Sequence, residues 1–335
     1  MAYQYENVKL DKSMYRLAGV SFSQALEAQD PSAQYKGTDL EGMDAFQRQL
    51  KRFDIKVKGP DSDCVEKFFA ASDSAVLFPE YISRCVRQGI QHSTALPHLV
   101  GATTRIDALD YRSILAEDDE NLQLKLVNEG ATIPTTTIRA QSNLVKLRKR
   151  GRMLVASYEA IRHQKLDLFS ITLRQIGANI ANMQLCDAID TILYGDGNNN
   201  EAYVFCTETH GVLTYDDLLE LWMKLRPYEM NTLLVSDKLM GKLLKLPELQ
   251  NPAVGNFANS GKLVTPFGAT VLNAPNMPDN GIIGLDNRYA LELVESGDVC
   301  VEYDKLIDRQ LERAAITVTC GFAKMFKEAS VLMEV

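Results

Sequence analysis

The sequence predicts an α+β protein, and three patterns in its 335 residues point to that class. Apolar residues over 163–194 recur every three to four positions, which is the period of a long helix. Apolar and polar residues alternate over 143–157 and again over 316–322, which is the period of strands. Helix and strand patterns then follow one another over 211–285. Together these segments predict helices and sheets in separate stretches of the chain.

The first 60 residues are polar, contain scattered aromatic residues and are interrupted by turn formers. We expect short helices near 22–28 and 43–53. Such a segment has too few apolar residues for a core of its own, so it must lie on another surface to become ordered. A floppy tail is one interpretation. The aromatic residues favour an arm laid across its own or a neighbouring subunit.

The pattern over residues 61–100 predicts a short helix around Val65 and a second helix that starts after Pro79.

A basic stripe lies on the strand predicted at 143–157. Its residues occupy every second position and therefore project from one face of an extended strand, while Val145, Leu147, Met153 and Val155 form the other face. An acidic run precedes the stripe. The stripe consists of Lys146, Arg148, Arg150 and Arg152, and the acidic run contains Asp118, Asp119 and Glu120.

A long two-stranded hairpin over residues 101–156 would be marginally stable alone in water. Separate blocks of opposite charge favour a hairpin that lies on another surface, where complementary charge fixes its register and partner. A solvated hairpin with its own cross-strand pairs is an alternative. A nucleic-acid patch is a third interpretation, but the stripe lacks interleaved aromatic residues and the acidic residues would repel phosphate.

The helix predicted within 163–194 has about 28 residues and a length of roughly 42 Å. Apolar side chains cover most of its circumference, which predicts burial on more than one side. Glycine at Gly195 and Gly197 supplies the left-handed stop. The core face of this helix contains Leu166, Phe169, Leu173, Ile176 and Ile180.

The region 211–285 predicts a compact α/β arrangement. Thr214 and Asp217 have the spacing of a helix-capping pair, and Ser236 is placed to cap a second helix after a buried strand at 232–235. Two further strands are expected near 262–265 and 269–272, and residues 282–335 finish the chain with strands.

The composition resembles that of an ordinary soluble globular protein, with 46% hydrophobic and 24% charged residues. The formal net charge of -8 argues against attraction of the whole chain to nucleic acid. No apolar run reaches the roughly 18–20 residues that span a bilayer, and the first residues lack the apolar core of a signal peptide. We therefore expect neither a membrane protein nor a secreted one.

The sequence predicts no catalytic residue, no metal and no cofactor. The six cysteines are spread along the chain without a C-x-x-C pair or a Cys/His cluster, so we expect buried, reduced thiols. Nucleotide-binding glycine loops, serine-nucleophile motifs and zinc-protease motifs do not occur, and the four histidines lie on separate segments. These observations predict a protein that is not an enzyme, with an α/β enzyme of unrecognised site as the alternative from another class.

Several short motifs occur in a characteristic order. The segment E-G-A-T-I-P at 129–134 precedes V-A-S-Y-E at 155–159, and Y-G-D-G follows at 194–197. This order resembles the tailed-bacteriophage major capsid proteins, in which such segments mark an extended loop, its return strand and the end of a spine helix. The resemblance covers about residues 60–335. Its later part rests on Leu234-Val235-Ser236, Asn251-Pro252, Gly268, Ala274-Pro275, Asp286, Val301–Asp304 and Ala315–Phe322.

The resemblance implies the tailed-phage major capsid fold, which is shared with encapsulins. It has a peripheral domain built on the spine helix, an axial domain, an extended loop and an N-terminal arm. The implied parts are an arm (1–60), a peripheral domain (61–100, 157–210 and 286–335), an extended β-hairpin loop (101–156) and an axial α/β domain (211–285).

The resemblance also implies the function. It implies a structural coat protein that self-assembles as hexamers and pentamers into an icosahedral shell around the double-stranded DNA of a tailed phage. The protein would be assembled in the cytoplasm of the bacterial host and would reside in the virion. The basic stripe and the acidic run would then make contacts between subunits. An encapsulin-like shell that holds cargo is the alternative, and the long arm favours the phage.

The implied partners are further copies of the chain, with portal, scaffolding and decoration proteins. DNA would be enclosed without sequence-specific binding, and no membrane is expected. Some members of the family lose a long N-terminal scaffold segment, but the arm here has only about 60 residues, which predicts an uncleaved chain with separate scaffolding. Some form a Lys–Asn cross-link. Lys125, Lys146 and Lys149 are suitably placed donors, but no local signature identifies an acceptor, so we expect none.

Overall fold

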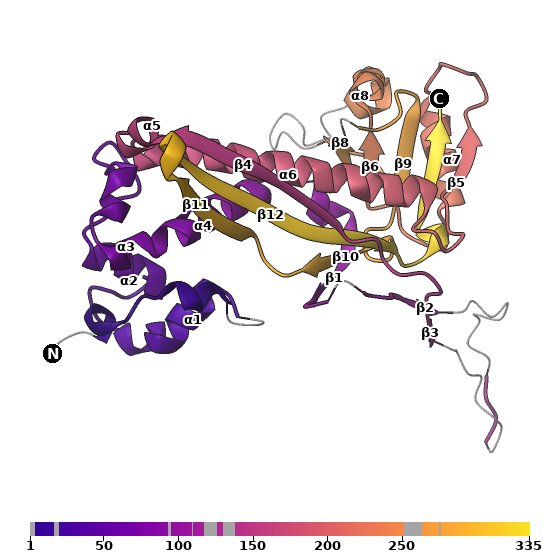
Figure 1. The fold of residues 1–335 in the computed structure, drawn as a ribbon. Coiled ribbons are helices and arrows are strands. Elements are labelled where there is room, and N and C mark those ends of the chain that lie inside the picture. The colour runs from indigo at the N-terminus through magenta and orange to yellow at the C-terminus, as the bar shows by residue number, and fades with distance from the viewer. Residues whose placement is uncertain are drawn as a thin grey trace. The chain divides into compact units, whose positions relative to one another are not determined.

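A computed structural model describes residues 4–16, 20–92, 95–108, 110–116, 126–129, 138–250, 263–274 and 276–335 (Figure 1). The chain forms two compact units. Unit 1 comprises Met1–Ser93, Lys149–Asn182 and Gly297–Thr319, and unit 2 comprises Thr94–Arg148, Met183–Ser296 and Cys320–Val335. Helix α6 (Leu166–Tyr194) and strand β12 (Leu311–Lys324) therefore contribute residues to both units.

The N-terminal part of unit 1 is helical, as the sequence predicts. Ser21 begins α1 through a capping box with Gln24, and Asp44 begins α2 in the same way with Gln47. Short 3₁₀ helices precede and connect these elements. The helices are α1 (Phe22–Gln29), α2 (Ala45–Arg52), α3 (Ser72–Ala75), α4 (Leu77–Gln91) and α5 (Tyr158–Arg162).

The prediction that α4 starts after Pro79 is wrong by a few residues. The helix begins at Leu77 and contains Pro79 as its third residue. The first N–H groups of a helix have no partner within the helix, so a proline there removes no hydrogen bond.

The predicted arm lies on its own chain. Apolar side chains of the first 55 residues belong to one core with α4 and with the first half of α6. The sequence left open whether this segment lies on its own subunit or on a neighbouring one. The structure places it on its own subunit. The N-terminal members of this core are Val8, Leu10, Met14, Phe22, Ala25, Leu26, Ala45, Phe46, Leu50 and Ile55.

The rest of unit 1 packs helices against strands. Strands β4 (Arg148–Ser157) and β11 (Cys300–Leu306) both pair with β12, β11 in antiparallel register from Cys300 opposite Thr317. Ala314 and Ile316 of β12 join the core that α4 and α6 form. On α6, Leu166, Leu173, Ile176 and Ile180 are buried in this core, and Phe169 packs against it as a half-buried side chain.

The apolar face predicted on the strand at 143–157, Val145, Leu147, Met153 and Val155, is not buried along its whole length. Val145 is buried and Leu147 is half-buried, but Met153 and Val155 are exposed by 53% and 52%. Leu154 packs against the core of unit 1 instead. The pairing of β4 with β12 sets which face of β4 turns inward. Alternation along one strand does not show that pairing.

Unit 2 contains a six-stranded sheet in the order β5-β13-β9-β6-β8-β7. Strand β6 is parallel to β8 and antiparallel to β9, and β13 is antiparallel to β9 and parallel to β5. The strands are β5 (Tyr203–Cys206), β6 (Thr232–Val235), β7 (Leu263–Val264), β8 (Thr270–Asn273), β9 (Gly281–Leu285) and β13 (Ser330–Glu334).

Helices cover both faces of this sheet. Leu233 and Val235 of β6 face α7 (Tyr215–Lys224), α8 (Asp237–Leu243) and α9 (Pro247–Gln250), while Leu234 faces the second half of α6. Successive side chains of a strand point to opposite faces, which explains why all four residues of β6 are buried. The predicted caps are confirmed, since Thr214 forms a capping box with Asp217 and Ser236 accepts from the Leu239 N–H.

The remaining strands of unit 2 lead into the extended loop, as we call residues 101–156. Strand β1 (Val100–Ile106) is parallel to β10 (Leu291–Ser296), which is antiparallel to the last residues of β12. Strands β2 (Ile114–Ala116) and β3 (Ile138–Ala140) pair over only three positions. No helix in the described part of the chain is both long and apolar enough to cross a bilayer.

Candidate subunit-contact site at the base of the extended loop

The basic stripe is mostly exposed. Lys146, Arg148 and Arg152 are exposed, and Arg150 is half-buried. The Arg148 guanidinium is bonded to the carboxylate of Asp187 on α6, whose side chain is 7% exposed. At Arg148 the stripe therefore makes an ion pair within its own subunit, which the sequence did not predict. The acidic residues Asp118, Asp119 and Glu120 lie outside the described residues.

Lys146 and Arg148 line a pocket of about 280 Å³ in unit 2, together with Asp187 and Asp196. Two cationic and two anionic side chains share this space, so their charges largely offset one another. The described residues contain no group of three His, Cys, Asp or Glu side chains that is placed to hold a metal ion. The pocket is thus suited to polar side-chain contacts.

Glu292 of β10 binds the outgoing strand of the extended loop, by which we mean residues 101–116. Its side chain is buried, and its carboxylate accepts hydrogen bonds from the hydroxyl groups of Thr104, Tyr111 and Ser113. The Tyr111 hydroxyl is 2.7 Å from Glu292 Oε1. A buried carboxylate needs such donors to offset its lost hydration. Burial and the bond to Glu292 raise the pKa of Tyr111.

The returning strand of the extended loop, by which we mean residues 138–156, is bonded to the turn that follows α6. The Asn143 backbone N–H donates to Asn198 Oδ1 at 3.0 Å, and the Asn143 side-chain amide donates to the Gly197 carbonyl. Asn198 Nδ2 in turn donates to Gln141 Oε1 at 3.2 Å and to Asp196 Oδ1 at 2.8 Å. The turn is possible because Gly195 and Gly197 have positive φ angles of 74° and 97°.

Lys324 completes this arrangement at the end of β12. Its side chain is buried, and Nζ donates to the carbonyl of Ile192 in the last turn of α6 at 3.1 Å. Its backbone N–H donates to Asp196 Oδ2 at 3.0 Å, and its carbonyl accepts from the Gln141 side chain at 3.1 Å. Burial lowers the pKa of Lys324 to about 8. Sequence reasoning missed this residue, although an inward position on an alternating strand was a signal for it.

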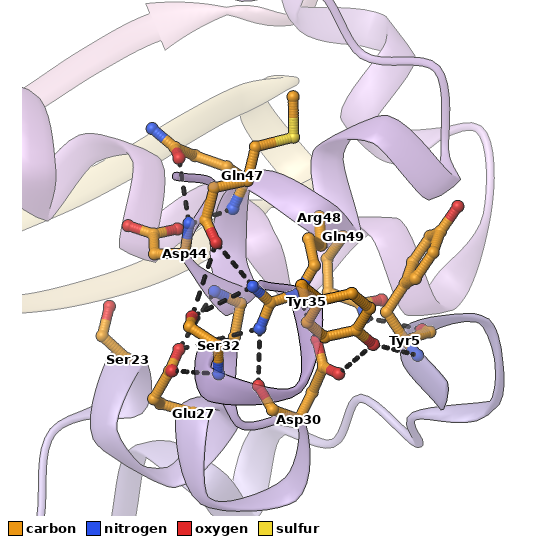
Figure 2. Close-up of polar contacts among 12 residues, drawn as sticks. Tyr5, Ser23, Glu27, Asp30, Ser32, Tyr35, Asp44, Gln47, Arg48 and Gln49 are labelled. Atoms are coloured by element: carbon orange, nitrogen blue, oxygen red, sulfur yellow. Dashed lines mark hydrogen bonds and ion pairs between the residues drawn. The ribbon is translucent and has the colours of Figure 1, made fainter. Parts of the chain in front are cut away.

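A second polar cluster, also missed, lies in the N-terminal part of unit 1 (Figure 2). Arg48 is fully buried, and its Nε donates to Asp30 Oδ2 at 2.6 Å. Other guanidinium nitrogens donate to the Ser32 hydroxyl and to the carbonyls of Asp30 and Met43. The Tyr35 ring lies 4.3 Å from the guanidinium carbon, and the Tyr35 hydroxyl donates to Asp30 Oδ1. This cluster holds the segments between α1 and α2 together.

The cysteines depart from the expectation of buried thiols. Cys85 and Cys320 are buried, but Cys206 and Cys300 are exposed, and none of the six cysteines, all of which the structure describes, is in a disulfide. Burial raises the pKa of Cys85 to about 11, which suppresses its thiolate. The exposed thiols lie on β5 and at the start of β11, where strand alternation turns them outward.

Both the sequence and the fold of this chain are similar to those of known capsid proteins. Residues 140–303 match the model of a family described as phage capsid protein. No curated protein matches the sequence. The structure is similar to the virus-like particle from Pyrococcus furiosus, with a TM-score of 0.52 and 14% identity over 76% of this chain and 98% of that one.

Two other similar structures are also shells. The capsid of the native GTA particle has a TM-score of 0.54 and 17% identity, covering 74% of this chain and 90% of that one. The capsid of Cyanophage P-SCSP1u has a TM-score of 0.51 and 13% identity, covering 72% and 88%. The predicted mixed helix-and-sheet capsid fold is therefore confirmed.

Proposed function

We propose that this chain, a structural phage capsid protein by its fold and by its family match over residues 140–303, builds a closed icosahedral shell from hexamers and pentamers of itself. The shell would enclose double-stranded DNA in the virion, without reading its sequence. Similarity to subunits of assembled capsids carries this proposal. The family match favours a phage capsid over a cargo-holding nanocompartment.

Exposed apolar side chains in unit 1 support an assembled state. Met153 and Val155 of β4 are exposed by 53% and 52%, and Leu168 and Ile171 of α6 by 57% and 54%. Met153 and Val155 lie on one face of β4, and Leu168 and Ile171 lie about one turn apart on α6, so each pair forms an exposed apolar patch of the kind that a partner covers. In a closed shell, the partner would be another copy in a heterologous contact that closes into a ring.

The basic stripe is our candidate for a second contact. Lys146 and Arg152 are exposed, whereas Arg148 already pairs with Asp187. We assign the acidic run Asp118–Glu120 of a neighbouring copy as the partner of the exposed members. Complementary charge of this kind fixes register more than it adds affinity. The net charge of -8 would keep packaged DNA from adhering to the shell.

We further propose assembly in the host bacterial cytoplasm, with scaffolding and portal proteins and with decoration proteins on the finished shell. The role is structural and requires no catalytic residue. Electron microscopy and sedimentation of the expressed chain, alone and with its scaffolding protein, test the proposal. Closed shells of uniform diameter are expected. A chain that stays monomeric in both preparations overturns the proposal.

A further inference from the structure

The base of the extended loop and the end of α6 are joined by a connected set of hydrogen bonds in unit 2. We name this set the polar hub. Each member bonds to at least two other groups of the set or of its surroundings, and the set connects the returning strand of the loop to the backbone of β12. The polar hub consists of Gln141, Asn143, Asp196, Asn198 and Lys324.

The paired strands of the loop cannot set their own direction. Strands β2 and β3 pair over three positions only, and a two-stranded hairpin of that length is unstable alone in water. The two strands are tied together by backbone bonds from Gln141 N–H to the Ser113 carbonyl and from Val145 N–H to the Tyr111 carbonyl, both 2.8 Å long. The pair must therefore be oriented by the residues to which its base is bonded.

Two clamps hold that base. Glu292 binds the outgoing strand through Tyr111 and Ser113. The polar hub binds the returning strand, and Asn198 is its centre, because its oxygen accepts from Asn143 and its nitrogen donates to Gln141 and Asp196. A single side-chain amide thus connects two positions of the loop to the turn after α6.

The hub is anchored to rigid elements on its other side. Asp196 accepts from the backbone N–H of Lys324, which is part of β12 and pairs with Leu291 of β10. The Lys324 ammonium group donates to the Ile192 carbonyl, one of the last carbonyls of α6 that lack a partner within the helix. The turn that carries Asn198 is therefore fixed to both a strand and a helix end.

We propose that the polar hub fixes the direction of the β2–β3 pair within unit 2, and that Asn198 is the positioning residue. The consequence for assembly rests on the proposed function, because a loop that contacts a neighbouring copy must present its residues in a fixed direction. The direction itself is a property of the single subunit.

A distance between two spin labels tests the proposal on unassembled subunits. One label is attached at Ile114→Cys in β2, which is exposed by 65%, and the other at the exposed Cys206 of β5, with the other accessible cysteines, Cys64, Cys186 and Cys300, replaced by Ser. We expect one narrow distance distribution for the otherwise unchanged chain. Asn198→Ala should broaden it at least twofold, and Asn143→Ala should broaden it less, because that change removes one bond only.

The matched control is Asn273→Ala. This asparagine is in the same unit, and its amide is bonded to the exposed Asp237 outside the hub. The distribution should keep its width in this variant. Melting temperatures of all variants identify any that fail to fold, and Asn143→Ala on the exposed side of the hub then remains as the test. An unchanged width in both Asn198→Ala and Asn143→Ala overturns the proposal.

Assembly assays of the same variants separate this proposal from the proposed function. Normal shells from Asn273→Ala and at least tenfold fewer shells from Asn198→Ala support both proposals. Absence of shells from the unsubstituted chain contradicts the proposed function and leaves the distance measurement as the test of the hub. Normal shells from an Asn198→Ala subunit with a broadened distribution overturn the assembly consequence.

Discussion

Gly89 of α4 and Gly177 of α6 face each other where these two helices pack in unit 1. A Cβ atom added to Gly177 would lie 2.1 Å from the Val86 carbonyl oxygen and 2.9 Å from Gly89 Cα. One added to Gly89 would lie 2.1 Å from the carbonyl oxygen of Arg174. The two backbones are thus in direct contact, and any side chain at either position would force the helices apart.

Gly177→Ala is therefore expected to destabilise the subunit. Forcing atoms into a packed core costs typically 1–3 kcal/mol, and here the obstacle is backbone that cannot rotate away, so we expect about 3 kcal/mol or more. Chemical unfolding measures the change. Gly241→Ala in α8 is the control, since nothing lies within 4 Å of an added Cβ there. That variant should be unchanged or up to about 1 kcal/mol more stable. Equal stability of Gly177→Ala and the unsubstituted chain would contradict the close approach.

Arg48→Met is expected to cost about 3–5 kcal/mol of unfolding free energy, because it leaves the buried carboxylate of Asp30 without its cationic partner. Lys238→Met is the control, because the side chains of Lys238 and its partner Asp279 are 67% and 83% exposed and such pairs contribute less than about 1 kcal/mol. Urea unfolding compares the two variants. Replacing both members of the buried pair, as in Asp30→Asn with Arg48→Met, should recover part of the loss. Similar small losses in both single variants would contradict the role of the cluster.

Deletion of residues 1–57 should damage the fold of unit 1. A loosely attached arm would be removable with loss of assembly alone, but Leu26 and Phe46 are buried in the same core as α4 and α6. We expect a poorly soluble subunit that binds a hydrophobic dye and loses its near-ultraviolet circular dichroism. A soluble, cooperatively folding product would show that this segment contributes little to the core.

Reversal of the exposed stripe charges, Lys146→Glu with Arg152→Glu, should reduce shell formation at least tenfold and leave the subunit folded. Lys149→Glu is the control, since Lys149 is an equally exposed cation outside the stripe. Combining the reversal with Asp118→Lys and Glu120→Lys should restore shells, because charge complementarity is restored. Sedimentation counts the particles. Normal shells from the double reversal would exclude the stripe from the contact.

Because Lys324 is buried, we expect the unfolding free energy of the subunit to depend on pH. Burial first and the charge of Lys327 second lower the pKa of Lys324 from 10.5 to about 8, against the opposing effect of Asp196, Glu328 and Glu201. Between about pH 8 and pH 10.5 the unfolded chain binds more protons at this residue, so the unfolding free energy rises with pH there. Below pH 8 the penalty is fully present.

The shift corresponds to about 3 kcal/mol across that window. Lys324→Met removes the titrating group, and its unfolding free energy should therefore rise less by this amount between pH 7.5 and pH 10.5. Urea unfolding of both chains at several pH values measures the difference. Parallel profiles would show that the Lys324 ammonium group is hydrated in the folded state.

Elements whose signals are local could be predicted from the amino-acid order alone. The period of α6 and the caps at Thr214 and Ser236 were predictable because each signal lies within one helix. The alternation at 316–322 identified a strand for the same reason. The order of motifs was enough for the capsid fold, which the comparisons confirm.

The packing of distant segments decided which polar side chains meet. Arg148 and Asp187 are 39 positions apart, and the Gln141 side chain bonds to a residue 183 positions away. It also decided that Arg48 and Lys324 are buried and that Met153 and Val155 are exposed. Such contacts depend on how distant segments pack, and periodicity within one segment contains no information about the surface that another segment presents to it.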